Sequence, residues 1–261
     1  MPSESPPPLP LRTTALGRLG LYAFNAGFWP YFAMSTAALF VPAVGIWAAT
    51  APFDRKRTLL RRYTEEWGAH YLERAPFAGV TVTGRDRLEL DRPAVYVANH
   101  ESMVDVLAIF SARLPALWVS KVENFYAPAL GWNMWLNGYI PVRRGYLPSI
   151  MTMMRTCLAR LAQGRSLIVF PEGTRSTDGK LRSFYRGAFF LAARARAPII
   201  PLCLDGTRNV LGKGTVLVRP QQVRVNILEP IEPSAYDFDS RRLRDATRDR
   251  MTVELAAMRR A

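Results

Sequence analysis

Cysteine and histidine are almost absent from this 261-residue chain, which holds two of each. Two cysteines cannot build a disulfide scaffold, and neither Cys157 nor Cys203 has another Cys or His at the spacing of a zinc site. The sequence therefore predicts no metal site. It also lacks a Walker A phosphate loop and a G-x-S-x-G nucleophile elbow, which argues against a P-loop nucleotide hydrolase and an elbow-type hydrolase.

Acidic residues are scarce as well, with 21 Asp and Glu against 35 Lys and Arg, so the net charge is +14. All but four of the basic residues are arginine, whose guanidinium fork matches phosphate oxygens. A GC-rich genome would produce the same bias without any functional cause. The functional interpretation is an anionic partner, and by charge alone both nucleic acid and an anionic membrane surface fit.

No charged residue occurs between positions 19 and 53, a stretch longer than the ~20 residues that cross a bilayer. Pro30 and Pro42 interrupt it, and aromatic residues cluster in its first half. Because interior prolines break helices and aromatic rings favour the headgroup region, we expect two short helices lying in one leaflet. A straight span and a hairpin packed on a soluble core are the alternatives. The basic residues at 54–62 place the remainder of the chain in the cytoplasm.

The chain divides into three parts on this pattern. Residues 1–14 are polar and proline-rich and are expected to be a disordered tail, and residues 15–75 hold the hydrophobic helices and their basic flank. Residues 76–261 form the main domain, in which short apolar runs alternate with helical segments. This alternation predicts an α/β layered fold, with a central mostly parallel or mixed sheet flanked by helices, plus the N-terminal hydrophobic two-helix membrane element.

Eight strands and five helices are expected in the main domain. The strands are predicted at 80–83, 94–98, 117–120, 139–142, 167–170, 199–204, 216–218 and 223–228. The helices are predicted at 103–113, 127–136, 150–163, 186–196 and 240–260. The last two strands have no helix between them and are expected to pair as a hairpin. The arginine-rich final helix is interpreted as a solvated face.

The first candidate site is the segment 99–105, Asn-His-Glu-Ser-Met-Val-Asp, at a strand-to-helix junction. Histidine is the side chain best suited to proton transfer near neutral pH, and a carboxylate can fix its tautomer. Residues five apart on a helix do not share a face, so His100 must lie in the turn before the helix to reach Asp105. The alternative is that Asn99 caps the helix and His100 is a surface residue. Against it, Asp105 stands among apolar residues, where an unpartnered carboxylate is costly.

The second candidate is the segment 170–176, Phe-Pro-Glu-Gly-Thr-Arg-Ser, directly after an apolar strand. A glycine turn allows close approach of a ligand, and Arg175 offers a fork for phosphate. Lys121 and Arg144 also follow strands. Each site alone could be an ordinary surface loop or a solvated charge. One anion-binding crevice that contains a base accounts for all four.

These residues resemble a known family. Asn99-His100-x-Ser102-x-x-Asp105, followed by the 170–176 segment, is similar to the glycerophospholipid acyltransferases, specifically the 1-acylglycerol-3-phosphate acyltransferases. The blocks at 120–123, 138–144 and 198–201 are similar too, so the resemblance covers about residues 80–204. Pro141 stands where the family favours an aromatic residue and Asn124 where it favours leucine. Both departures touch the block expected to bind the acceptor phosphate.

The resemblance implies an O-acyltransferase that moves an acyl chain from acyl-CoA, or from acyl carrier protein, to the free hydroxyl of 1-acylglycerol-3-phosphate, giving phosphatidic acid. It assigns His100 as general base and Asp105 as its partner, without a cofactor, a metal or a covalent enzyme intermediate. The substrate-binding residues that it implies are Lys121, Arg144 and Arg175 around the phosphate, and Glu172, Gly173 and Thr174 in the pocket.

The implied partners are a lysophospholipid, acyl-CoA and an anionic membrane surface, with acyl carrier protein as a further candidate and no nucleic acid. The expected location is the cytoplasmic face of the inner membrane, with a monotopic, single or hairpin anchor. Two alternatives remain: an acyltransferase for another lysolipid, such as a lyso-ornithine lipid, and a non-catalytic protein that binds a membrane surface. Core packing is expected for four apolar residues, with an acyl-chain groove as the alternative: Phe125, Trp132, Met134 and Trp135.

Overall fold

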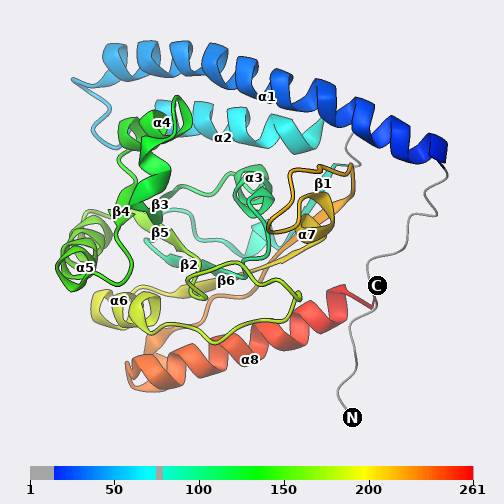
Figure 1. The fold of residues 1–261 in the computed structure, drawn as a ribbon. Coiled ribbons are helices and arrows are strands. Elements are labelled where there is room, and N and C mark those ends of the chain that lie inside the picture. Colours follow the sequence, from blue (N-terminus) through cyan, green and yellow to red (C-terminus); the bar gives the residue numbers. More distant parts are fainter. Residues whose placement is uncertain (1–14, 75–78, 261) are drawn as a thin grey trace.

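A mixed sheet of seven strands forms the centre of the computed structural model, which describes residues 15–74 and 79–260 (Figure 1). Its order is β1-β7-β6-β2-β5-β3-β4, and every neighbouring pair is parallel except β6 and β7. The strands are β1 Val80–Thr83, β2 Val95–Ala98, β3 Ala116–Lys121, β4 Ile140–Val142, β5 Ser166–Val169, β6 Ile199–Asp205 and β7 Val223–Ile227. The predicted α/β layered fold is confirmed.

The predicted hairpin at the end of the sheet is wrong. Residues 216–218 form no strand, and β7 pairs with β6 on one side and with β1 on the other. The short apolar run at 216–218 contacts the first helix instead: the Asn25 side chain bonds both the N–H and the carbonyl of Val218, and Trp29 Nε1 donates to the carbonyl of Val216. Its backbone is therefore satisfied without a partner strand.

Helices cover both faces of the sheet, which explains why its central strands are apolar throughout. All four residues of β2 are buried. In Figure 1, α2 and α3 lie above the sheet, and α6 and α8 lie below it. The helices of the main domain are α3 Val104–Ser111, α4 Leu130–Asn137, α5 Leu147–Ala162, α6 Gly187–Ala195, α7 Thr207–Val210 and α8 Ser240–Met258.

The N-terminal hydrophobic segment forms one helix, α1 Ala15–Thr50, and not the two short helices that were expected within it. The helix runs through both Pro30 and Pro42. A proline inside a helix removes the hydrogen bond to the carbonyl four residues earlier and crowds that carbonyl, but the turns on either side of Pro30 are held by other contacts. Asn25 and Trp29 bond the 216–218 loop, while Ser35 bonds the Tyr71 hydroxyl at 2.9 Å.

The second helix of the N-terminal unit is α2 Thr58–Glu73, which begins within the basic residues at 54–62 and packs along α1 (Figure 1). Among the described residues α1 is the one helix long and apolar enough to cross a membrane: within residues 17–50, an 18-residue window has a mean hydropathy of 1.7, and 11% of that window is buried. Most of its apolar surface therefore faces away from the protein. The expected tail at 1–14 and the boundary at 75–76 fall outside the described residues.

The final helix is not simply a solvated face. On one side of α8, Leu243, Thr247, Met251 and Leu255 are buried, and the helix packs against β6. Its N-terminus is capped by Asp239, whose carboxylate accepts from the N–H of Arg241 at 2.7 Å. This packing brings the end of α8 close to the β2–α3 turn, where Arg259 pairs with Glu101.

Candidate active site

His100 lies in the turn between β2 and α3, and its side chain folds over the first turn of that helix. Its Nδ1 is 2.7 Å from Oδ2 of Asp105, a side chain that is fully buried. The same oxygen accepts the backbone N–H groups of Glu101 at 2.7 Å and Ser102 at 2.9 Å. A carboxylate oxygen that already accepts two N–H groups also accepts a hydrogen from Nδ1, and in a neutral imidazole this tautomer leaves the lone pair on Nε2. The contact thereby fixes the orientation of the ring.

Phe170 fixes the plane of the imidazole. The two rings stack with centroids 4.0 Å apart and an interplanar angle of 13°. The His100 side chain is 12% exposed, so only a small part of the ring meets solvent. Sequence reasoning placed Phe170 in the second motif but gave it no role, because stacking between two strand ends depends on the sheet order β2-β5.

Glu172 joins the two candidate segments through the backbone. Its buried carboxylate accepts the N–H of His100 at 2.7 Å and the N–H of Arg182 at 2.9 Å. In return, the carbonyl of His100 accepts the N–H of Ser176 at 2.7 Å. Burial raises the pKa of Glu172, and its two N–H donors oppose this rise. Glu172 thus holds the segment 170–176 against the His100 turn.

Gly173 has a backbone conformation that favours glycine, with φ of +68°. A Cβ at this position would lie 2.6 Å from the ring of Tyr185, so a side chain would also collide. Thr174 and Arg175 come next on the same turn and are half-buried. The glycine therefore allows the loop to turn tightly beside His100, and Arg175 lies on this turn.

The three predicted phosphate-binding cations lie along one edge of the sheet. Strands β2, β5, β3 and β4 are parallel neighbours, so the residues after them succeed one another along that edge. With ~4.8 Å between neighbouring strands, β3, which ends at Lys121, lies about 10 Å from β2, and β4, which comes before Arg144, lies about 14 Å from it in the plane of the sheet. Lys121 pairs with Glu123 at 3.2 Å. Within the described ranges, neither Arg144 nor Arg175 pairs with an acidic side chain.

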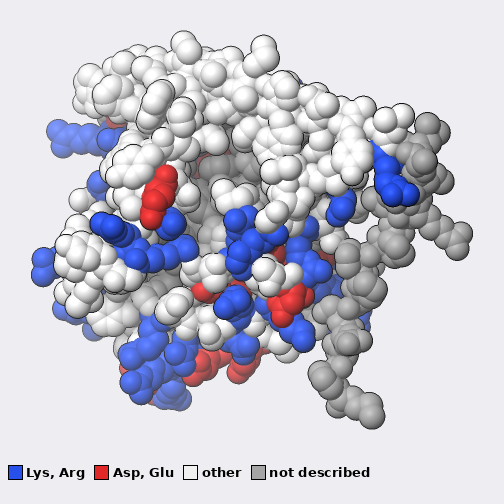
Figure 2. All heavy atoms as spheres, viewed as in Figure 1, with Lys and Arg blue, Asp and Glu red and all other residues white. Residues whose placement is uncertain are grey.

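Figure 2 shows how charge is distributed on one face of the molecule. Lys and Arg side chains gather in a band below the uncharged surface of α1. Acidic side chains are fewer on this face. A basic band beside an apolar ridge suits a ligand that has an anionic head and an apolar chain.

Sequence reasoning missed the polar contacts behind the His100 turn. Asn99 does not cap α3: its amide bonds both the carbonyl and the N–H of Leu204 on β6, at 2.9 and 2.8 Å. Glu101 is 5% exposed and pairs with Arg259 at the end of α8. Burial raises the pKa of Glu101 to about 7, although the charge of Arg259 opposes the shift. The only sequence signal was a carboxylate next to His100, since its partner lies at the far end of the chain.

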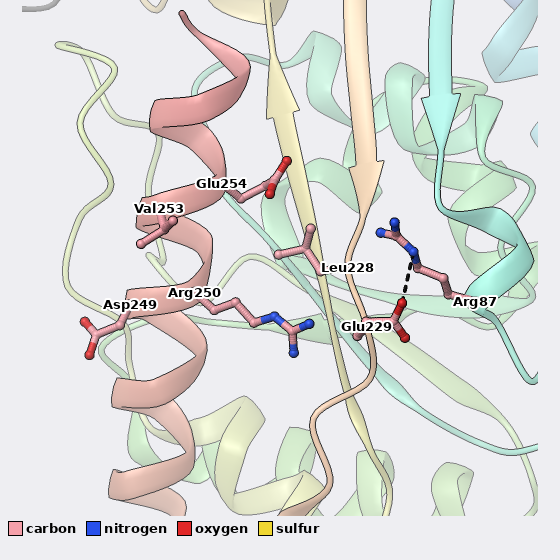
Figure 3. Close-up of a pocket in the computed structure, with 7 residues that line it drawn as sticks. All are labelled: Arg87, Leu228, Glu229, Asp249, Arg250, Val253 and Glu254. Atoms are coloured by element: carbon pink, nitrogen blue, oxygen red, sulfur yellow. Dashed lines mark ion pairs between the residues drawn. The ribbon is translucent and has the colours of Figure 1, made fainter.

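A separate groove lies between α8 and the end of β7, away from these residues (Figure 3). Arg87 and Glu229 form an ion pair at 3.1 Å on the side of the groove away from α8. None of the candidate site residues lines the groove, and its charges are mixed. Its lining residues are Arg87, Leu228, Glu229, Asp249, Arg250, Val253 and Glu254.

The cysteines and the metal-ligating residue types form no further site in the part of the chain that the structure describes. Both Cys157 and Cys203 are buried free thiols, and burial raises the pKa of Cys157 to about 12. Within residues 15–74 and 79–260, no three His, Cys, Asp or Glu side chains are grouped so that they could hold a metal ion.

A family model and curated relatives both point to the acyltransferases that the sequence resembles. The sequence profile described as Acyltransferase matches residues 79–205. A 1-acyl-sn-glycerol-3-phosphate acyltransferase of Chlamydomonas reinhardtii is 34% identical over 210 residues, which are 79% of this chain and 63% of that protein. The chloroplastic enzyme LPAT1 of Arabidopsis thaliana, also named 1-acyl-sn-glycerol-3-phosphate acyltransferase, is 37% identical over 62% of this chain and 46% of its own. The chain thus spans less than two thirds of these relatives.

A solved structure is similar over nearly the whole chain. It is the crystal structure of the 1-acyl-sn-glycerophosphate acyltransferase PlsC from Thermotoga maritima, with a TM-score of 0.77 and 24% identity. The match covers 92% of this chain and 97% of that one. At this level of identity the similarity establishes a shared fold.

Proposed function

We propose that the chain is an acyltransferase that transfers an acyl chain to the free hydroxyl of 1-acylglycerol-3-phosphate and so forms phosphatidic acid. The match of residues 79–205 to the Acyltransferase family and the 34% identity to a 1-acyl-sn-glycerol-3-phosphate acyltransferase support this proposal. The observation that carries the proposal is the contact between His100 and the buried Asp105, which orients a base at the edge of the sheet. The names of the relatives support the choice of acceptor. A protein that only binds membranes has no use for an oriented base.

The proposed reaction is a direct attack by the acceptor on the thioester. Nε2 of His100 takes the proton from the acceptor hydroxyl while the hydroxyl oxygen bonds to the thioester carbonyl carbon. The tetrahedral intermediate then collapses, the C–S bond breaks, and the imidazolium returns the proton to the departing thiolate. Asp105 stabilises the imidazolium, as the carboxylate does in hydrolase triads. A positioned base of this kind contributes ~10²–10⁴-fold in rate.

We propose acyl-CoA as the donor, with acyl carrier protein as the alternative carrier and with no separate cofactor. The direct test supplies purified protein with each thioester and with lysophosphatidic acid, and measures release of the free thiol. Lyso-ornithine lipid and other lysolipids serve as competing acceptors in the same assay. Turnover with lysophosphatidic acid above all others supports the proposal, whereas vesicle binding without turnover on any acceptor indicates a binding protein.

Arg175 tests the proposed phosphate clamp. Since a hydrogen bond to a charged group contributes about 1.5–3 kcal/mol, Arg175→Ala should raise the KM for the lysolipid acceptor by about 10- to 100-fold. The KM for acyl-CoA should change much less. Arg182→Ala is the matched control, because that exposed side chain leaves the same loop while only its backbone N–H bonds Glu172. Equal changes in both KM values after Arg175→Ala would remove it from the clamp.

We further propose that α1 and α4 attach the protein to the cytoplasmic face of the inner membrane. Trp132 and Trp135 on α4 are 51% and 49% exposed, and Trp132 contacts Phe40 of α1 with centroids 5.7 Å apart. Arg55 and Lys56 are exposed in the turn after α1, where they can meet anionic headgroups. Half-exposed tryptophans beside an apolar helix are typical of an interfacial belt.

The double substitution Trp132→Ala and Trp135→Ala should weaken binding to phosphatidylglycerol-containing vesicles by roughly tenfold or more, because each large apolar side chain contributes ~1.5–3 kcal/mol on burial. Vesicle co-sedimentation measures the change. Val253→Ala is the control, since Val253 is 71% exposed on α8, on the other side of the sheet. Vesicle affinity equal to that of the wild type would show that α4 stays clear of the membrane.

A further inference from the structure

We propose that Arg259, at the end of α8, is a positioning residue for acyl transfer that acts through Glu101 on the His100–Asp105 pair. The inference rests on the proposed function. The Arg259 guanidinium pairs with the Glu101 carboxylate, donates to the carbonyl of Gly179 at 2.7 Å, and lies 3.4 Å from Oδ1 of Asp205 on β6. One side chain therefore links the segment 99–105, which carries His100, and the loop after the segment 170–176 to β6.

Glu101 transmits the position of Arg259 to the base. It directly follows His100, and its backbone N–H donates to Oδ2 of Asp105 at 2.7 Å, the oxygen that also contacts the imidazole. Its side chain is 7% exposed and also accepts from Nδ2 of Asn99 at 3.3 Å. A buried carboxylate that loses its cation either takes up a proton or turns towards water. Either change alters the contacts of Glu101 and would shift the N–H that holds Asp105.

The second contact of Arg259 lies on the loop that comes after Arg175. Gly179 is buried there, and the neighbouring Arg208 donates to the carbonyl of Thr177 at 3.5 Å. The same loop meets the His100 turn directly, because the N–H of Ser176 donates to the carbonyl of His100 at 2.7 Å. Arg259 thus fixes the distance between the segment that carries the base and the segment that carries the proposed phosphate ligand.

Arg224 separates this role from simple anchoring of α8. It donates to Oδ2 of Asp205 at 2.8 Å and bonds the carbonyl of Met258 in the last turn of α8. It bonds neither catalytic segment in the described structure. If Arg259 only held the helix end, loss of Arg224 would have the same effect on the rate.

The experiment compares Arg259→Ala with Arg224→Ala and with Arg260→Ala, an exposed neighbour. Arg259→Ala should lower kcat by about 10- to 100-fold with both KM values nearly unchanged, because displacement of a catalytic group by about 1 Å has an effect of that size. Arg224→Ala should lower Tm but keep kcat within about twofold. Hydrogen exchange at 99–103 and 176–182 should rise only in the Arg259 variant. Equal kcat for Arg259→Ala and wild type, or an equal loss for Arg224→Ala, would overturn the proposal.

Two further variants keep the test decisive if Arg259→Ala folds poorly. Arg259→Lys retains the charge beside Glu101 without the fork that also reaches Gly179, so its kcat should fall between those of the wild type and the alanine variant. In a double-mutant cycle, Glu101→Ala and Arg259→Ala together should be no slower than Arg259→Ala alone. Independent, multiplying losses would contradict action through Glu101. If the wild type itself shows no turnover, the proposed function fails, whereas the hydrogen-exchange result still tests the contacts of Arg259.

Discussion

Replacing His100 with alanine should lower kcat by about 10²–10⁴-fold, because Nε2 of this ring is the proposed base and the substitution removes general base catalysis alone. Release of CoA from acyl-CoA in the presence of lysophosphatidic acid measures the loss. The KM values should change little, since the proposed phosphate ligands stay in place. An unchanged rate would show that the base lies elsewhere.

The fold should survive this substitution. Asp105 keeps the N–H groups of Glu101 and Ser102 when the imidazole is gone, and the backbone of His100 keeps its bonds to Glu172 and Ser176. The alanine variant leaves a space against Phe170, so added imidazole should restore part of the rate. His70→Ala is the control: this ring contacts Tyr31 and the carbonyl of Trp67 between α1 and α2. The His70→Ala variant should keep the kcat of the wild type.

The central strands of the sheet could be predicted because they are buried on both faces. Such strands are apolar at every position, as in β2 and most of β6, and stand out against the helices between them. Residues 216–218 are also apolar, but they do not lie in the sheet. They lie beside α1, and their polar backbone is satisfied by Asn25 and Trp29 from nearly two hundred residues away. A short apolar run does not reveal which partner satisfies it.

The break expected in α1 was wrong for a related reason. Proline lowers the stability of a helix locally, and the prediction weighed only that local effect. Contacts on both sides of Pro30, to the 216–218 loop and to α2, hold the helix together. A helix supported along its length by tertiary contacts can tolerate what an isolated helix cannot.

The candidate site was predictable as far as it is local in the sequence. His100 can reach Asp105 from the turn that leads into the helix, so the six residues 100–105 contain both the proposed base and its partner. The stacking of Phe170 and the pairing of Glu101 with Arg259 depend on which strands and helices become neighbours. Those neighbours are a property of the assembled sheet, and no local pattern encodes them.

Asp105→Asn should lower kcat by about 10³–10⁴-fold, as loss of the carboxylate does in hydrolase triads. The amide oxygen can replace Oδ2 and keep its three donors, but it carries no charge to stabilise an imidazolium. The amide nitrogen then occupies the site of Oδ1, which is buried and has no hydrogen-bond partner in the described structure. An unsatisfied donor there costs about 1–3 kcal/mol of stability.

Two measurements separate the catalytic loss from the structural one. Thermal unfolding of the Asp105→Asn variant gives the stability change, and kcat at a temperature well below its Tm gives the chemical change. Asp245→Asn, an exposed carboxylate paired with Arg244 on α8, should alter neither. Because Asp105 acts through the imidazole, the double variant with His100→Ala should be no slower than His100→Ala alone. A further loss in the double variant would mean that the carboxylate has a role of its own in the reaction, apart from the histidine.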